Sequence, residues 1–180
     1  MREVLVTGAT GRIGSYFARS AGGRYHLRLT DLPGSDFGDV ASHGECVEAD
    51  LTDLHAAHEL CAGIDTFVHL AADPDPFATW SSLLPANIIA TYNMMTAAVA
   101  AGCRRLIYAS SIHAVSGYAA DVQVKTSEPV NPGDLYGVTK CFGEALGRYV
   151  AEQEGLSVIA VRIGAAQPEA AARPTHSLPL

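Results

Sequence analysis

Residues 4–14 read Val4-Leu5-Val6-Thr7-Gly8-Ala9-Thr10-Gly11-Arg12-Ile13-Gly14, and this stretch decides the fold. A short apolar strand runs directly into a turn with glycines at positions 8, 11 and 14, and a helix can begin near Arg12. The first glycine permits the tight turn, and the third lets the helix pack close to the strand. A strand, a glycine turn and a helix in this order predict the first unit of a parallel α/β sheet.

Strand and helix signals alternate along the rest of the chain. After the first strand, β-rich runs occur at residues 26–30, 46–49, 66–70, 106–109 and 157–163. Helical runs occur at residues 12–21, from a cap at Thr52-Asp53 to Cys61, and at 83–101 and 135–154. Six strands with helical crossovers predict an α/β fold with a doubly wound parallel sheet, the Rossmann arrangement, over residues 1–164. The tail at residues 165–180 is rich in Ala and Pro, and we expect it to be poorly ordered.

Composition narrows the class of protein. The chain has 180 residues, of which 48% are hydrophobic and 17% charged, as expected for one globular domain. Its net charge of −7 disfavours nucleic acid and anionic membranes as partners. The first apolar run is too short for a signal peptide, and we expect no membrane-spanning stretch. The four cysteines lack CxxC spacing, which predicts mostly buried, reduced thiols in a cytoplasmic protein; they are Cys46, Cys61, Cys103 and Cys141.

The glycine turn favours a dinucleotide cofactor. The free N–H groups of the loop and the positive end of the helix dipole attract phosphate. We therefore expect the pyrophosphate of NAD to lie against Gly8, Gly11, Arg12, Ile13 and Gly14. A glycine turn that binds nothing is the alternative.

Asp31 closes the second predicted strand, 17 residues after Gly14. A carboxylate there can accept both ribose hydroxyls of the adenosine and would repel a 2′-phosphate, so NAD is favoured over NADP. A solvated turn carboxylate is the alternative, and Arg12 keeps NADP open. Other contacts to the cofactor are expected where later strands end, at Asp50, Leu51, Leu70, Ala71 and Ala72.

Tyr136 and Lys140 lie four residues apart on a predicted helix and share a face. A nearby ammonium is expected to favour the phenolate and lower the pKa of the tyrosine. Tyr136 can then exchange a proton with a substrate hydroxyl while a hydride moves to or from nicotinamide, and Lys140 can hold the nicotinamide ribose. Ser111, after the fifth strand, can donate to the reacting oxygen. A surface pair on a helix and a turn serine are the alternatives.

Two further groups of histidines need an interpretation. His113 can donate to a substrate carboxylate or hydroxyl, or it can pack beneath the edge of the sheet, and both remain open. His55 and His58 lie three residues apart on a predicted helix. Because no further ligand cluster accompanies them, we expect no metal site.

Taken together, these motifs make residues 1 to about 164 resemble the extended short-chain dehydrogenase/reductase family, which comprises NAD-dependent epimerases and dehydratases. The resemblance rests on GATGRIG at 8–14, HLAA at 69–72, Asn87, the serine pair at 110–111 and YGVTK at 136–140. It implies that Ser111 is the catalytic hydroxyl, Tyr136 the acid/base and Lys140 its partner. It also implies that Asn87 shapes the cofactor site and supports the lysine through water.

Within that family the likeness is closest to uronate dehydrogenases, through SSIH at 110–113, LYGVTKCFGE at 135–144 and VRIG at 161–164. These enzymes oxidise a cyclic sugar acid to a lactone with NAD. The resemblance therefore implies an NAD-dependent oxidoreductase acting on a hydroxyl of a sugar or sugar acid. Ile112 and Ala165 stand where that group carries asparagine and serine, so two polar groups expected near the sugar are apolar here.

Two other functions remain open: a nucleotide-sugar epimerase with tightly held NAD, and a non-catalytic NAD-binding module. A dehydratase is disfavoured because Ile112 and His113 replace the Asp-Glu pair of those relatives. Extended family members continue for about a hundred residues as a substrate lobe, which we expect to be absent or truncated here. Arg173 is a candidate replacement for a substrate-clamping arginine. The resemblance also implies a homodimer through the two long helices.

Overall fold

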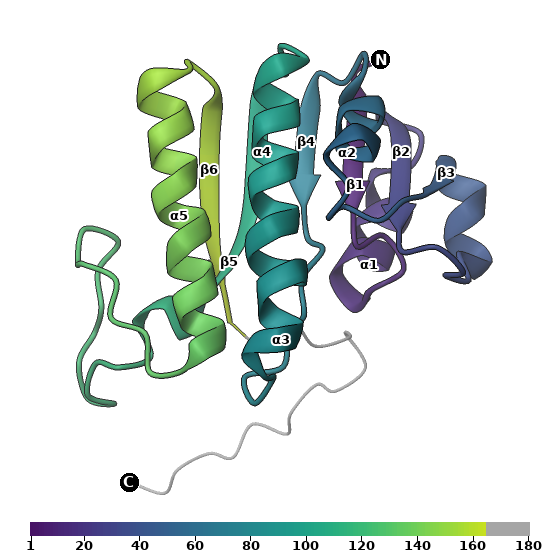
Figure 1. Cartoon of the computed structure of the whole chain (residues 1–180). Coiled ribbons are helices and arrows are strands. Elements are labelled where there is room, and N and C mark those ends of the chain that lie inside the picture. Colours follow the sequence, from purple (N-terminus) through teal and green to yellow (C-terminus); the bar gives the residue numbers. More distant parts are fainter. Residues whose placement is uncertain (165–180) are drawn as a thin grey trace, which may run out of the picture.

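The computed structural model describes residues 1–164 of the chain. Six parallel strands form one sheet in the order β3-β2-β1-β4-β5-β6 (Figure 1). The strand order reverses between β1 and β4, which confirms the predicted doubly wound Rossmann arrangement. The bounds of the strands are β1 Glu3–Thr7, β2 His26–Asp31, β3 Glu45–Glu48, β4 Thr66–His69, β5 Arg105–Ser111 and β6 Ser157–Ile163.

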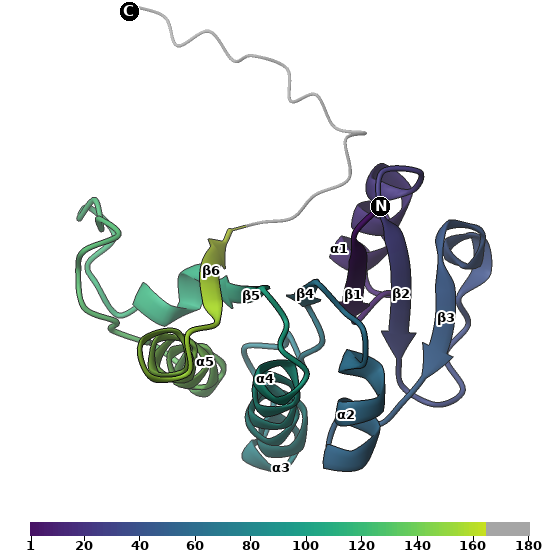
Figure 2. The same ribbon diagram turned by 90° about the horizontal axis from the view of Figure 1, so that it is seen from above.

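Helices cover both faces of this sheet. The view from above in Figure 2 places α1 on one face and α2, α4 and α5 on the other. The segments η1 and η3 are 3-10 helices, and η2 is a π-helix. The bounds are α1 Arg12–Ala21, η1 Gly38–His43, α2 Leu54–Cys61, α3 Trp80–Leu83, η2 Leu84–Ile89, α4 Ala90–Ala100, η3 Ile112–Val115 and α5 Leu135–Gln153. The predicted tail and Arg173 lie outside the described residues.

The core consists of two apolar clusters, one on each side of the sheet. Alternation along β1 sends Val4 and Val6 into the cluster on the α1 side and Leu5 into the other cluster. The cluster beneath α2, α4 and α5 is the larger one, and Phe67 and Leu106 are fully buried in it. All four cysteines are free; Cys61 and Cys103 are buried, whereas Cys46 and Cys141 are half-buried.

The strand β5 is longer than the predicted run at 106–109. It pairs with β6 along its whole length, from Arg105 opposite Ser157 to Ser111 opposite Ile163. Ser111 is therefore the last residue of the strand and does not follow it. The ladder with β6 fixes its position, and a non-local pairing of this kind cannot be read from the local pattern of β5.

The helix predicted at 83–101 begins at Trp80 and contains a π turn at Leu84–Ile89. Pro85 has no N–H to donate, and the amide of Ala90 bonds to the Pro85 carbonyl five residues earlier. Asn87, within this wider turn, is buried. An irregularity of this kind often marks a functional site.

Contrary to the expectation from the sequence, one helical stretch is long and apolar enough to span a membrane, judged by length and composition only. The helical run Trp80–Ala100 has 21 residues, and a window of 18 residues within it has a mean hydropathy of 1.2 and at most two charged residues. Half of this window is buried inside the fold, and the core helix of a soluble protein passes the same test. The run packs beneath the sheet, so its apolar character is accounted for by the core.

Candidate active site

A cavity of about 1200 Å³ opens at the carboxyl ends of the strands. This is the edge of a doubly wound sheet where ligands bind. The predicted site residues, with the exception of Asn87, come together in its wall: Gly8, Gly11, Arg12, Ile13, Gly14, Asp31, Asp50, Leu51, Leu70, Ala71, Ala72, Ser111, His113, Tyr136 and Lys140.

The glycine loop packs against neighbouring backbone at positions where a side chain would collide. Gly8 has a φ of 67°, in the left-handed region, and a Cβ there would lie 2.9 Å from the amide nitrogen of Ala71. A Cβ on Gly14 would collide with the carbonyl oxygen of Gly8 and lie 2.8 Å from the Cα of Ala9. The first and third glycines are therefore required by close approach of the loop to β4 and of α1 to the loop.

Asp31, at the end of β2, is hydrogen-bonded to the same loop. Its Oδ2 accepts from the amide of Thr10 at 2.9 Å and from the Thr10 hydroxyl at 2.7 Å, and its Oδ1 accepts from the amide of Leu32 at 3.0 Å. The carboxylate lines the cavity and at the same time braces the glycine loop. Sequence reasoning missed this second task, because Thr10 carries no signal beyond its place in the loop.

A buried histidine joins β1 to β4 beneath the loop. Thr7 Oγ1 accepts from the amides of Leu70 and Ala71, each at 3.2 Å, and lies 2.8 Å from His69 Nδ1. Because these two amides use both lone pairs of the hydroxyl oxygen, its hydrogen is left to donate to Nδ1, and His69 Nε2 faces Thr91 Oγ1 at 3.1 Å. Burial first, and the charge of Lys140 second, lower the pKa of His69 to about 3. His69 is therefore a neutral strut that fixes the strand ends.

Ser111, Tyr136 and Lys140 meet at the far end of the cavity from the glycine loop. Lys140 Nζ lies 5.5 Å from the centre of the Tyr136 ring and 5.3 Å from that of Tyr108. Burial lowers the pKa of Lys140 to about 8. The ammonium thus lies against two aromatic rings, where their π faces attract it.

The expectation that Lys140 lowers the pKa of Tyr136 is wrong for the chain by itself. Burial raises the pKa of Tyr136 above its ordinary value, and the carboxylates of Asp134 and Asp73 act in the same direction. A hydrogen bond with Ser111 opposes this rise without cancelling it. Desolvation of the phenolate is therefore the main cause of the raised pKa of Tyr136.

Asn87, expected to shape the cofactor site and to support Lys140, lies behind the lining of the cavity. Its amide group is buried and joins three elements: Oδ1 accepts from the amide of Asp73 at 2.7 Å, and Nδ2 donates to the Asp73 carbonyl and to Thr139 Oγ1, both at 3.0 Å. Thr139 in turn donates to the Tyr136 carbonyl at 2.7 Å. Asn87 therefore supports the helix of Tyr136 and Lys140 from behind.

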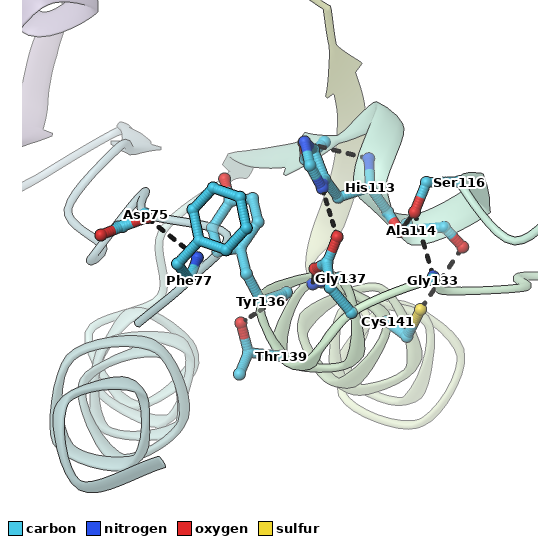
Figure 3. A network of polar contacts seen from close by, with 12 residues as sticks. Asp75, Phe77, His113, Ala114, Ser116, Gly133, Tyr136, Gly137, Thr139 and Cys141 are labelled. Atoms are coloured by element: carbon cyan, nitrogen blue, oxygen red, sulfur yellow. Dashed lines mark hydrogen bonds and ion pairs between the residues drawn. The ribbon is translucent and has the colours of Figure 1, made fainter. Parts of the chain in front are cut away.

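His113, in η3, is held from three sides next to the start of α5 (Figure 3). Its amide donates to Ser111 Oγ at 3.2 Å, and its Nδ1 lies 2.6 Å from Asp134 Oδ2. Its ring stands edge-on to Tyr136, with centroids 5.4 Å apart. The alternative in which His113 packs beneath the sheet edge is wrong, because the residue lines the cavity.

A carboxylate also joins the strand of Ser111 to the helix of Tyr136. Glu144, one turn after Lys140, accepts from Ser110 Oγ at 2.5 Å and from Arg162 Nε and Nη2 at 2.9 and 2.8 Å. Burial acts to raise the pKa of Glu144, but the bonds from Arg162 and Ser110 outweigh it and hold that pKa below its usual range. This ionised group fixes the distance between β5, β6 and α5.

Sequence reasoning missed Asp134 and Glu144, both of which hold catalytic elements in place. Asp134 precedes α5 and could have been recognised as its N-cap. Glu144 gave no local signal, because its partners Ser110 and Arg162 lie 34 and 18 residues away. Within the part of the chain that the structure describes, no group of three or more His, Cys, Asp or Glu residues could hold a metal ion.

The glycine loop, the acid at the end of β2 and the Ser-Tyr-Lys set stand in one cavity. Residues 4–174 match the pattern of the NAD dependent epimerase/dehydratase family. This chain belongs to that family. The name of the family, with its dependence on NAD, agrees with the sheet order and the cavity described above.

Among characterised relatives, the uronate dehydrogenase of Agrobacterium fabrum is 39% identical over 172 residues, which cover 94% of this chain and 63% of that enzyme. The NAD-dependent glucose-6-phosphate dehydrogenase of Haloferax volcanii is 38% identical, covering 91% of this chain and 68% of that enzyme. A variant of uronate dehydrogenase from Agrobacterium tumefaciens, solved in complex with NAD, superposes with a TM-score of 0.80 at 35% identity, covering 88% of this chain and 59% of that one. The chain thus spans about three fifths to two thirds of the length of these relatives.

Proposed function

We propose that this chain is the NAD-binding and catalytic part of an oxidoreductase that transfers a hydride between nicotinamide and a hydroxyl-bearing carbon of a sugar or sugar acid. The proposal rests on the observation that two sets of residues line one cavity. The glycine loop and Asp31 form one end, and Ser111, Tyr136 and Lys140 form the other. The names of the relatives, which are dehydrogenases of a uronate and of glucose 6-phosphate, support this class of substrate.

The residues present fit NAD. Backbone at Gly8, Gly11 and Gly14 would meet the pyrophosphate, and Asp31 would meet the ribose hydroxyls of the adenosine, with Arg12 and Ile13 beside the loop. Asp50 and Leu51 would border the adenine, and Leu70, Ala71 and Ala72 leave room along the floor. When bound, NAD supplies the acceptor for the hydride.

The protein supplies proton transfer and orientation. Ser111 would donate its hydroxyl hydrogen to the substrate oxygen that reacts, because the Ser111 oxygen already accepts from the amide of His113. Tyr136 Oη would take the proton of that substrate hydroxyl as the carbon is oxidised, and would return it in the reverse direction. Lys140 would hold the nicotinamide ribose, and its positive charge favours the tyrosinate form of Tyr136, which is the form that can accept the proton.

We also propose a cytoplasmic homodimer that assembles through α4 and α5. Apolar side chains on the outer surface of η2, α4 and α5 are exposed: Ile89, Tyr92, Val138 and Tyr149 are 38%, 51%, 42% and 53% accessible. Large apolar groups gathered on two neighbouring helices are typical of a subunit interface. Sedimentation at increasing concentration tests this, and a Tyr92→Lys variant should shift the protein toward the monomer. A monomer at every concentration would contradict it.

The activity is tested by a panel of uronic acids and aldoses with NAD and with NADP, in which NADH or NADPH formation is measured. We expect NADH from at least one sugar or sugar acid and a lower rate with NADP. An epimerase would retain NAD on purification and produce no NADH. Binding of NAD without turnover of any sugar would favour a non-catalytic NAD-binding module.

A further inference from the structure

The carboxylate of Asp134 performs two tasks in the wall of the cavity. One oxygen, Oδ1, accepts from the amide of Gly137 at 2.7 Å and so caps the first turn of α5. The other, Oδ2, lies 2.6 Å from Nδ1 of His113. The side chains of His113 and Asp134 are 32% and 26% exposed, so the pair is shielded from solvent without being sealed from it. His113 is thereby tied to the helix that carries Tyr136.

The charge of Asp134 decides which nitrogen of His113 carries the proton. Burial acts to raise the pKa of Asp134, but the hydrogen bonds from the Gly137 amide and from His113 outweigh it and hold that pKa below its usual range. An ionised carboxylate only accepts hydrogen bonds, so Nδ1 of His113 must donate. In the neutral imidazole, Nε2 then carries the lone pair.

The remaining contacts of His113 fix its backbone and leave Nε2 without a hydrogen bond in the described part of the chain. The backbone is fixed, because the His113 amide donates to Ser111 Oγ and the His113 carbonyl accepts from Ser116 Oγ at 3.1 Å. The close approach of α5 requires Gly137, where a Cβ would collide with the His113 carbonyl. Among residues 1–164, no side chain or backbone group is hydrogen-bonded to Nε2, and His113 lines the cavity beside Tyr136.

We infer that Asp134 is a positioning residue that fixes His113 with its proton on Nδ1, so that Nε2 accepts a hydrogen bond from a substrate hydroxyl next to the carbon that reacts. The proximity of His113 to Tyr136 sets this location, since Tyr136 meets the reacting oxygen. A substrate carboxylate has no hydrogen to donate to Nε2, so a lone pair on Nε2 selects a hydroxyl. The substrate half of this inference rests on the proposed function, whereas the position of the proton does not.

The position of the proton can be measured without activity. Long-range proton–nitrogen NMR correlations distinguish a protonated from a bare ring nitrogen, and a His113→Gln variant assigns the signals. At alkaline pH, where imidazole is ordinarily neutral, we expect His113 to show a protonated Nδ1 and a bare Nε2. A proton on Nε2 in the unmodified chain would overturn the inference, whatever the variants show.

Asp134→Asn is the sharpest variant, because asparagine is as good an N-cap as aspartate and presents an amide N–H₂ to His113. The proton should therefore move to Nε2, while the thermal midpoint stays within a few degrees. Asp134→Ser, which keeps a cap but loses the contact, should give a mixture of both tautomers. An unchanged His113 pattern in a folded Asp134→Asn protein would contradict the inference.

Kinetics test whether Nε2 of His113 accepts a hydrogen bond from a substrate hydroxyl. For a sugar that turns over, Asp134→Asn should raise KM by about 10-fold or more and leave the affinity for NAD unchanged. Removal of the neighbouring hydroxyl from the sugar should raise KM of the unmodified chain by a similar factor and have little effect on the variant. Equal losses in both proteins would overturn it. If the unmodified chain turns over no sugar, the proposed function fails, and the NMR result alone decides the role of Asp134.

Discussion

The two ends of the cavity are built in different ways. At the cofactor end, between β1 and β2, the backbone at Gly8 and Gly14 approaches its neighbours so closely that a Cβ would collide, and Asp31 supplies the carboxylate proposed to meet the ribose. At the catalytic end, between β5 and α5, side chains do the work, and distant carboxylates hold them: Asp134 for His113 and Glu144 for Ser110. The comparison teaches that a binding surface made of backbone can be specified locally, whereas one made of side chains needs partners from elsewhere in the fold.

The largest expected effect separates chemistry from binding. Tyr136→Phe should lower turnover by about 100- to 10,000-fold, because the hydroxyl that exchanges the proton is lost while the ring still packs beside His113. The affinity for NAD, measured by calorimetry, should stay nearly unchanged. Tyr149→Phe, on the exposed side of α5, is the matched control and should retain full turnover. Unaltered turnover in Tyr136→Phe would remove the proposed mechanism.

A substitution at the cofactor end is expected to weaken NAD binding. Gly14→Val places a branched side chain against the carbonyl of Gly8 and the Cα of Ala9, which are backbone atoms that cannot move aside. We expect a loss of about 3 kcal/mol in the free energy of unfolding and a loss of NAD affinity. Ser20→Val, on the exposed face of the same helix, controls for helix propensity and should be nearly neutral. Wild-type NAD binding by Gly14→Val would show that the loop does not bind the cofactor.

Much of the cofactor end was predictable, and the reason is physical. The spacing of Gly8, Gly11 and Gly14 between a strand and a helix, with Asp31 at the next strand end, is a local steric requirement. The sheet order and all predicted strands were confirmed. The identities of Ser111, Tyr136 and Lys140 as a set came from the family resemblance, and the structure brings them together.

The supports of the catalytic end were not predictable in the same way. Glu144 acts through Ser110, 34 residues away, and the π turn at Leu84–Ile89 follows from packing as well as from Pro85; Asn87, whose partner Thr139 is 52 residues away, was named only through the family resemblance. The expected direction of the pKa shift of Tyr136 was wrong, because the sequence does not show that this side chain is buried. Burial is set by the whole fold, so charge pairs read from sequence give a direction only for exposed groups.

The pH dependence of stability tests the burial of Lys140, at the catalytic end of the cavity. Burial lowers the pKa of this lysine from 10.5 to about 8, so between these values the unfolded chain binds more protons than the folded one. Stability therefore rises with pH in this window, by about 2 kcal/mol between pH 7 and 10.

The matched variant for this titration is Lys140→Met, which should lack the rise. It also separates the lysine from Tyr108 and Tyr136, whose pKa values are raised by burial and which act in the opposite direction near pH 10. Denaturant midpoints measured across the range check the difference between the two proteins. Parallel curves would mean that Lys140 is not buried as described.

The smallest effect is expected for cofactor choice. Asp31→Asn should narrow the preference for NAD over NADP by about 1–3 kcal/mol, since the repulsion of a 2′-phosphate is removed while the amide oxygen can still accept from Thr10. Calorimetric titration with both cofactors measures it. Asp39→Asn, at an exposed ion pair with Arg19, is the control. Equal binding of NAD and NADP by the unmodified chain would refute the role of Asp31.

If the two ends of the cavity form a single NAD site, a crystal structure of the chain with NAD will show the cofactor spanning both. We expect the adenosine ribose against Asp31, the pyrophosphate on Gly8–Gly14 and the nicotinamide beside Tyr136 and Lys140. Nicotinamide placed away from Tyr136, or NAD bound outside the cavity, would contradict the claim.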